Sequence, residues 1–339
     1  MKSPVGTFIL AFVLLLVLAV VSLISGAVSI SVYGVLQWMI GVETTLLTQT
    51  ERTILLQLRL PRIITACLVG GSLGIAGVGF QGLFRNPLAD PYVIGASSGA
   101  GLGVTLAVVL GLQVSVMGLS GIAVSAVAGS LLAVAIVFAI GSVGRGSSVL
   151  TLLLAGVAVS SMINAIASLL MYMNDDSVVV ILAWLMGSLA GNDWNVVLAT
   201  AVSSLVGFSI LWSMSRPMDV FLLGDATSQS LGLDLFRFRL LLVAGSSIAT
   251  AAAVASAGII GFVGLIAPHI ARRIVGPRHL LLLPMSACVG AAIMLIADVV
   301  ARTLVAPAEL PVGILTALLG CPFFLFLLKS RNEALEGAA

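Results

Sequence analysis

The chain has 339 residues, of which 60% are hydrophobic and 8% are charged, and its mean hydropathy is +1.24. A soluble domain carries roughly 25% charged residues, so this composition excludes an ordinary soluble enzyme and is typical of a protein in a lipid bilayer. The net charge of +2 is too small, and too dispersed along the chain, to indicate a nucleic-acid partner.

Long uncharged runs predict most of the membrane-spanning helices, because a bilayer core requires about 20 apolar residues per helix. In chain order these runs lie at about 5–30, 63–84, 91–144 (two helices that turn near 111–113), 146–174, 194–215, 280–301 and 310–328. The run at 177–192 is shorter and predicts an interfacial or re-entrant helix.

The uncharged run 240–271 decides between nine and ten helices. If it holds one helix to about Gly258 and a short second one over 262–270, 11 of the 15 basic residues lie on the cytoplasmic side and four lie outside. A single helix here gives a split of 7 to 8 instead. Since cytoplasmic loops carry an excess of Lys and Arg, the charges predict ten helices with both termini cytoplasmic.

Two segments of the chain resemble each other, one beginning at Arg62 and the other at Arg239. Each passes through a helix of small residues to a Phe-x-Gly-Leu turn followed by Pro, as at 80–87 and 262–268. The charges orient the two helices in opposite directions, which predicts the inverted repeat common among transporters, with repeats at about 62–174 and 239–328. Glycine-rich apolar helices can also match by chance, but the matching positions after the helix favour a repeat. The structural residues expected in the turns are Asn86, Pro87, Asp90, Pro268 and His269.

Glycines recur every fourth residue at 95, 99 and 103, and again at 70 and 74. Small residues at this spacing let two helices approach closely in a membrane. They predict tight packing of these helices without any chemistry.

The sequence lacks the patterns of several catalytic and metal sites. Lys2 and Lys329 are its only lysines, so no P-loop can bind a nucleotide. His269 and His279 have no ligand neighbours at metal spacing, and no nucleophile, base and orienting group form a motif. We therefore expect no catalytic residue, no metal and no bound cofactor in this chain.

Asp298 is the one acidic residue well inside a predicted span, four residues before Arg302. This spacing favours an ion pair on one helix face. An intramembrane carboxylate can also couple transport to protons, so an ion-coupled secondary transporter with inverted repeats stays open as the alternative.

Six segments together resemble the FecCD-type permeases, the membrane subunits of ABC importers for iron-siderophores, haem and vitamin B12. They are LRLPR (58–62), FRNPLADPYVIGASSGAG (84–101), LLLAG (152–156), SRPMD (215–219), GFVGLIAPHI (261–270) and ADVVARTLVAPAELPVGILTALLGCPFF (297–324). The resemblance covers roughly residues 50–330 in unbroken order. It implies an all-α integral membrane protein with about ten transmembrane helices in a single permease domain, 1–339.

The same resemblance implies the partners. A second permease subunit forms a homodimer or a related pair, two separate ATPase subunits hold ATP and Mg²⁺, and a binding protein outside the cell membrane delivers the substrate. The resemblance also implies that Arg59, Arg62 and Arg302 receive carboxylates of that binding protein. Interfacial anchoring is the competing interpretation of these three arginines, since arginines at the ends of spans often reach the headgroups.

The resemblance gives a role to the stretch 218–239, which in such permeases forms short helices in a cleft of the ATPase. The matching coupling residues here are Leu222, Gly224, Asp225, Gly232 and Leu233. The cytoplasmic gate lies just before LLLAG, at Ser147, Ser148, Val149 and Leu150. Vitamin B12 importers have small hydroxyl residues at this gate, so the apolar pair at 149–150 weakens the case for vitamin B12 as the substrate.

Polar residues at helical spacing on one predicted span suggest the lining of a pathway: Ser160, Ser161, Asn164 and Ser168. The function predicted from the sequence is ATP-driven import of a large metal chelate through a pathway at the permease dimer interface. An iron-siderophore is the leading substrate, with haem or a corrinoid as the others.

Overall fold

The computed structural model describes residues 4–26, 30–41, 47–112, 115–116, 119–141 and 149–336. The elements of the first half are α1 (Pro4–Ile24), α2 (Val32–Met39), α3 (Gln49–Thr53), the π-helix η1 (Ile54–Arg59), α4 (Leu60–Phe84), the 3₁₀-helix η2 (Pro91–Ile94), α5 (Ala96–Val109), β1 (Ser115–Val116), β2 (Leu119–Ser120) and α6 (Gly121–Gly141). Those of the second half are α7 (Val149–Tyr172), the 3₁₀-helix η3 (Asp175–Ser177), α8 (Val178–Leu185), α9 (Trp194–Ser213), α10 (Ser215–Phe221), α11 (Asp225–Ser230), α12 (Leu235–Ala257), α13 (Val263–Val275), α14 (His279–Thr303) and α15 (Val312–Glu336).

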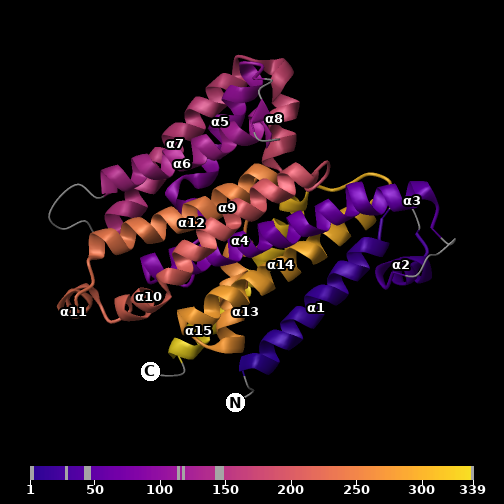
Figure 1. Ribbon diagram of the computed structural model, residues 1–339. Helices are drawn as coiled ribbons and strands as arrows, with labels where there is room; N and C mark the ends of the chain where they lie inside the picture. Colours follow the sequence, from indigo (N-terminus) through magenta and orange to yellow (C-terminus); the bar gives the residue numbers. More distant parts are fainter. Residues whose placement is uncertain are drawn as a thin grey trace.

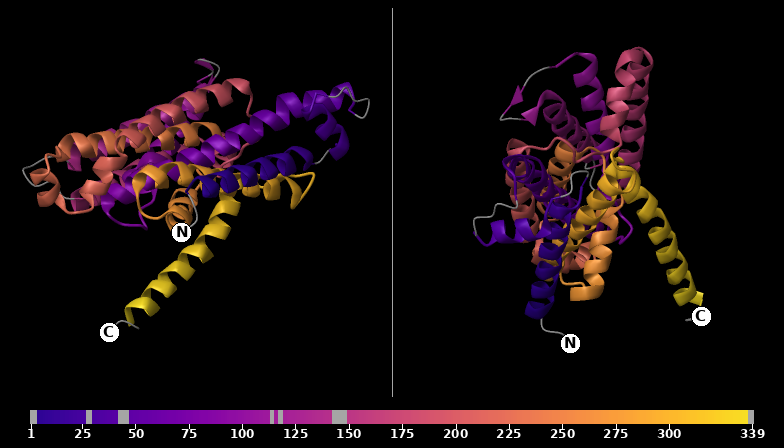
Figure 2. Two further views of the ribbon diagram at one scale, coloured as in Figure 1. Left: turned by 60° about the horizontal axis from the view of Figure 1, so that its bottom comes forward. Right: turned by 90° about the vertical axis from the view of Figure 1, so that its right-hand side faces the viewer.

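The long helices form one inclined bundle with α4 and α12 at its centre (Figure 1). The helices differ in how much of their most apolar 18 residues is buried. In the segment that contains α4, 78% of these residues are buried, and in α12 72% are, whereas in α1 only 11% are. The helix α15 projects from the bundle (Figure 2). The bundle is thus built around α4 and α12, with α1 on its surface.

Seven described helical segments are long and apolar enough to cross a membrane, namely α1, the segment that ends with α4, α6, α7, α9, α12 and α14. The helix α5 and the stretch Val312–Leu325 of α15 are apolar but shorter, and α13 is the short helix expected after Gly258. Together these ten helices confirm an all-α membrane fold of about ten spans. The small antiparallel pairing of β1 with β2, between α5 and α6, was not expected from the sequence.

Close contacts between helices depend on the predicted small-residue stripes. A Cβ at Gly70 or Gly74 of α4 would overlap the carbonyl oxygens of Gly290 and Ser286 in α14. Similarly, a Cβ at Gly99 would overlap the backbone of α6. Lipid chains are as apolar as leucine, so such packing, rather than exclusion from water, holds membrane helices together.

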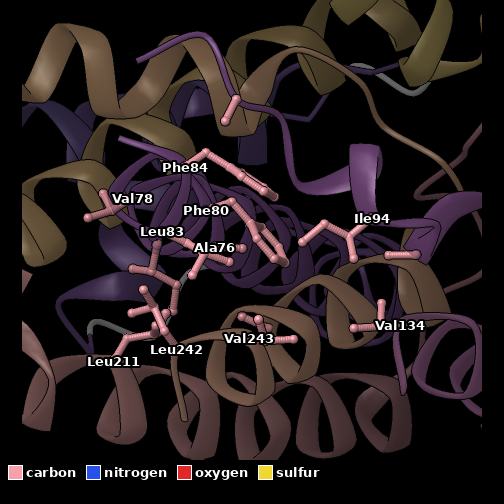
Figure 3. Close-up of a cluster of buried hydrophobic side chains, with 14 of the residues drawn as sticks. Ala76, Val78, Phe80, Leu83, Phe84, Ile94, Val134, Leu211, Leu242 and Val243 are labelled. Atoms are coloured by element: carbon pink, nitrogen blue, oxygen red, sulfur yellow. The ribbon is translucent and has the colours of Figure 1, made fainter. Parts of the chain in front are cut away.

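A cluster of large apolar side chains fills the centre of the bundle (Figure 3). Phe80 and Leu83 of α4 are fully buried with Leu211 of α9 and Leu242 of α12. Each such side chain makes dozens of weak dispersion contacts, which are lost if the packing loosens. This cluster fixes α4 against α9 and α12.

The run 240–271 contains two helices, as the charge pattern predicts. The helix α12 ends before Gly258 (φ +70), and Phe262 has a left-handed backbone (φ +67) immediately before α13. The side chain of Ile260, in the connection between α12 and α13, is 1% exposed, so this connection is anchored in the core.

Three local predictions were wrong. The first helix ends at Ile24 instead of about residue 30. In the first repeat, α4 stays helical through the Phe-x-Gly-Leu motif to Phe84 and turns only at Arg85 (φ +47). Pro268 and His269 lie inside α13 rather than in a turn. Pro268 leaves the carbonyl of Gly264 without its helical donor, and this carbonyl lies against the backbone of α4 at Gly77.

Candidate functional site

Residues 215–234 connect α9 to α12, and we call them the short-helix segment. Gly224 (φ +102) separates α10 from α11, and Gly232 (φ +88) precedes α12. The hydroxyl of Ser228 donates to the carbonyl oxygens of Gly224 and Val220, at 2.6 and 3.0 Å. These bonds fasten α11 to α10, so the segment is a folded unit rather than a solvated loop.

The carboxylate of Asp225 joins the short-helix segment to two long helices. Its Oδ1 lies 2.5 Å from Nη2 of Arg85, the residue that ends α4. Its Oδ2 lies 2.6 Å from Nη2 of Arg239, in the first turns of α12. The side chain of Asp225 is 44% exposed, whereas that of Arg239 is 9% exposed. One half-exposed carboxylate therefore bridges two arginines that belong to the bundle.

Arg85 also binds Phe221, the last residue of α10. Its Nε and Nη2 donate to the carbonyl oxygen of Phe221, at 3.0 and 2.7 Å. Its guanidinium carbon lies 3.8 Å from the centre of the Phe221 ring, in reach of a cation–π attraction. The ring of Phe221 is fully buried beside that of Phe238 in α12, with 4.8 Å between centroids. The end of α10 is thus held by charge, hydrogen bonds and packing.

A third long helix is attached through His279, the first residue of α14. Nδ1 of His279 lies 2.5 Å from Oδ1 of Asp219 in α10. The backbone N–H of His279 donates to the same oxygen, at 3.2 Å. A displacement of α10 or α11 would therefore pull directly on α4, α12 and α14.

The short-helix segment presents apolar side chains that nothing in the described chain covers. Leu222, Leu223 and Leu231 are 49%, 61% and 63% exposed, whereas Leu233 is half-buried against the core. A Cβ at Gly232 would meet nothing within 4 Å among the described residues, so the surface at this glycine is open. The short-helix segment therefore combines exposed leucines with the anchored carboxylates of Asp219 and Asp225.

At the opposite end of the bundle, a second carboxylate bridges two arginines. Asp298 of α14 is fully buried, and its Oδ1 accepts from Nε of Arg62 in α4 at 2.8 Å. Its Oδ2 lies 3.1 Å from Nε of Arg302, four residues further along α14. The expected pair of Asp298 with Arg302 is therefore present, and the second bridge, to Arg62, links α4 with α14.

Arg59 and Arg302 hold the carboxyl end of α1. Nη1 of Arg59 donates to the carbonyl oxygens of Leu23 and Ile24, at 2.7 and 2.9 Å. Nη2 of Arg302 donates to the carbonyl oxygen of Ser22, at 3.0 Å. The last carbonyls of a helix lack partners within it and carry a partial negative charge, so two arginines satisfy them well. Each of these arginines is 6% exposed.

A cavity of about 380 Å³ opens beside these arginines. Its lining includes Arg59, Arg62, Arg302, Asp193 and Glu309. Nη1 of Arg62 donates to both carboxylate oxygens of Glu309, at 3.0 and 2.9 Å. We call these three arginines with Asp298 and Glu309 the arginine cluster. It brings together all three expected docking residues, with their guanidinium groups engaged inside the chain.

The candidate pathway residues do not all share one face of α7. Ser161, Asn164 and Ser168 are exposed, and the hydroxyl of Ser161 donates to the carbonyl oxygen of Val157 at 2.8 Å. The hydroxyl of Ser160, in contrast, points inward to Gly95. Consecutive residues of an α-helix are rotated by about 100° about its axis, so Ser160 and Ser161 point in different directions.

Of the expected gate residues, Ser147 and Ser148 lie outside the described residues, as does the side chain of Val149. Leu150 is 62% exposed at the start of α7.

Between α4 and α5 the chain turns at Asn86, Pro87 and Asp90, where turns were expected. Oδ1 of Asn86 accepts from the backbone N–H of Leu88 at 3.0 Å, and Oδ1 of Asp90 accepts from that of Tyr92 at 2.8 Å. Burial raises the pKa of the Asp90 carboxyl, while the bond from Tyr92 acts in the opposite direction. Within the described residues, no group of three or more His, Cys, Asp or Glu side chains could hold a metal ion.

Sequence reasoning missed five residues of the two candidate sites. Arg85, Arg239, Asp219 and His279 belong to the contacts of the short-helix segment, and Glu309 belongs to the arginine cluster. Arg85 and Arg239 did carry a signal, because each stands beside the end of a long apolar run. Their common partner, Asp225, is 140 residues from Arg85 in the chain, a separation that helical periodicity cannot connect.

Comparison with known proteins gives a consistent result. The model of the FecCD transport family matches residues 14–330. The cobalamin import system permease protein BtuC of Halobacterium salinarum is 44% identical over 284 residues, covering 84% of this chain and 75% of that protein. The Fe(3+)-citrate import system permease protein YfmE of Bacillus subtilis is 38% identical over 333 residues, covering 97% and 96%.

A solved structure has the same fold over nearly the whole chain. It is an inward-facing ABC transporter described as of the metal-chelate type, with a TM-score of 0.84 and 36% sequence identity. The match covers 96% of this chain and 99% of the other.

Proposed function

Since the chain belongs to the FecCD transport family, whose members are permease subunits of transporters rather than enzymes, we propose that it is the membrane subunit of a binding-protein-dependent ABC importer. In this proposal a separate ATPase chain, holding ATP and Mg²⁺, drives import of a large metal chelate into the cytoplasm. The observation that carries the proposal is the short-helix segment, where exposed leucines lie beside charges that are anchored to three long helices.

The ATPase docks on the short-helix segment. Leu222, Leu223 and Leu231 supply the apolar contact. The ion pairs of Asp225 and the hydrogen bonds of Asp219 with His279 carry its movement into the bundle. A rigid-body shift of packed helices is an established way to switch a protein between two states. Because the short-helix segment is tied to α4, α12 and α14, a shift of the ATPase would displace all three together.

The arginine cluster is the docking site for the binding protein on the other side of the membrane. Arginine suits this role because its planar group holds a carboxylate through two parallel hydrogen bonds. Arg59 and Arg302 are 6% exposed and bind the end of α1, so they act chiefly by holding the surface in shape. Arg62, whose partner Glu309 is 41% exposed, makes the direct contact.

The pathway lies between two copies of this chain, against α7. In the isolated chain Ser161, Asn164 and Ser168 are exposed among apolar neighbours. Polar groups in a membrane segment avoid lipid and face water or another helix. A second, identical permease subunit across this face would enclose them, and Leu150 would lie near the gate at the other end of α7.

In this proposal the protein lies in the cell membrane with both termini in the cytoplasm. The start of α1 and the end of α15 lie toward the bundle end that carries α10 and α11, as the charge bias of the sequence requires (Figure 1). We propose an iron-siderophore as the cargo, with haem or a corrinoid as the other candidates, since relatives import ferric citrate and cobalamin.

The surroundings of Asp298 argue against the alternative of an ion-coupled secondary transporter. The form of this alternative that the sequence offers requires an unpaired carboxylate in the membrane, and Asp298 is its candidate. Both oxygens of Asp298 lie within about one hydrogen-bond length of an arginine, so this carboxylate is engaged in two ion pairs that join helices of the bundle rather than left unpaired in the membrane.

Purification and transport assays test the proposal. The affinity-tagged chain should co-purify with an ATPase subunit, and uptake into vesicles should require ATP and stop with vanadate. Uptake that continues with vanadate and collapses with a proton uncoupler would refute the importer and restore the ion-coupled alternative.

A further inference from the structure

The contact of Arg62 with Glu309 is built differently from the other contacts of the arginine cluster. Nε of Arg62 binds Asp298, which is fully buried. On the other side of the guanidinium, both oxygens of Glu309 share the single nitrogen Nη1, at 3.0 and 2.9 Å. A carboxylate that binds two guanidinium nitrogens through parallel bonds is held more strongly than one that shares a single nitrogen.

Glu309 is also placed where it can leave. It lies in the connection between α14 and α15, and its side chain is 41% exposed. Exposed ion pairs change an equilibrium by about fivefold at most. Arg62, in contrast, is 11% exposed and fixed by Asp298, so the cation would stay in place if Glu309 moved away.

The cavity beside the pair favours a second carboxylate as the occupant. Its lining has three arginines, of which Arg59 and Arg302 are committed to α1. Besides Glu309 it has one more carboxylate, Asp193, which is engaged in capping α9. Without Glu309, the remaining charge at Arg62 would face this cavity, which at about 380 Å³ is large enough for an acidic side chain.

We propose that Glu309 is an internal competitor of the binding protein: it occupies on Arg62 the position that a carboxylate of the binding protein takes on docking. This inference rests on the proposed docking role of the arginine cluster and adds a regulatory contact to it. The exchange replaces one carboxylate by another at the same cation, so docking neither creates nor removes a buried charge. It also weakens the resting affinity, which favours release of the binding protein after delivery.

The test measures the affinity of the importer's own binding protein, purified and labelled, for the intact complex in nanodiscs. Glu309→Gln removes the competing charge and should tighten binding by about two- to fivefold at low salt, with a smaller gain at high salt. The matched control is Glu51→Gln, which removes one charge from another helix at the same end of the bundle. A glutamine there preserves the capping interaction with Thr48, and affinity should not change.

Two variants at Arg62 separate this inference from the docking proposal. Arg62→Gln should weaken binding at least tenfold, and adding Glu309→Gln to it should then bring no gain, because the competitor has lost its cation. If Arg62→Gln weakens binding but Glu309→Gln leaves it unchanged or weaker, the competitor role is wrong and the docking role stands. If Arg62→Gln has no effect, the docking proposal itself fails.

Discussion

The two ends of the bundle use the same arrangement, one carboxylate between two arginines, at very different depths. Asp298 is fully buried and joins α4 to α14 inside the membrane region. Asp225 is 44% exposed and joins the short-helix segment to the ends of α4 and α12. A buried bridge cannot open without leaving charges in an apolar environment, whereas water can replace an exposed one. The first therefore stabilises the scaffold, and the second is suited to transmit movement.

The largest effect is expected from Asp298→Ala. This change leaves the charges of Arg62 and Arg302 without their shared carboxylate, and breaking a buried ion pair typically costs about 3–5 kcal/mol. Denaturant unfolding in detergent measures the loss. Asp298→Asn, which keeps the shape and one acceptor, serves as the milder control. A loss below about 1 kcal/mol in the alanine variant would contradict the scaffold role.

At the other end, Asp225→Ala should affect coupling more than stability. Its ion pairs are partly exposed, so the unfolding free energy should fall by only about 1 kcal/mol. In the assembled complex, however, ATP hydrolysis should continue while uptake falls severalfold, because α11 is no longer tied to Arg85 and Arg239. Hydrolysis and uptake that fall in proportion would indicate lost assembly instead.

The backbone of Gly232 offers a subtler comparison. Its left-handed conformation (φ +88) should make Gly232→Ala cost about 1 kcal/mol, although the added carbon meets nothing within 4 Å. Gly261 has equally open surroundings without a left-handed φ, so Gly261→Ala should be neutral or slightly stabilising. Equal unfolding free energies for the two variants would show that backbone strain is not the reason for Gly232. The variant Gly232→Trp tests the proposed docking surface instead: its bulky side chain should displace the ATPase, and co-purification can detect this loss.

The smallest effect is expected from Arg237→Ala. This arginine pairs with Asp234 three residues away, but its side chain is 82% exposed. Such pairs contribute little, and the unfolding free energy should change by no more than about 0.5 kcal/mol. If Arg237→Ala lowers the unfolding free energy as much as Asp225→Ala, the degree of burial does not determine how much an ion pair contributes to stability.

The sequence was informative where the cause is local. The break between α12 and α13, the glycine contacts of α4 and the pair of Asp298 with Arg302 follow from composition and helical spacing. The bridge from Arg62 to Asp298 spans 236 residues, and no periodicity connects residues so far apart.

The error at Pro268 and the inward orientation of Ser160 both reflect packing against other helices. A proline disfavours a helix interior, but tertiary packing can override this preference, and here α13 continues through Pro268 with its Gly264 carbonyl against α4. Helical spacing alone cannot say which face of α7 is covered, so the inward side chain of Ser160 required the packing of α5 and η2 to be known.

The central claim, that a separate ATPase docks on the short-helix segment, is tested most directly by cross-linking. In a variant without the native cysteines, a single cysteine replaces either Leu223, 61% exposed on the short-helix segment, or Tyr172, 82% exposed at the far end of α7 (Figure 1). A short thiol-to-amine reagent should join the ATPase chain to position 223 and not to position 172. Cross-linking of the ATPase through position 172, with none through position 223, would contradict the account.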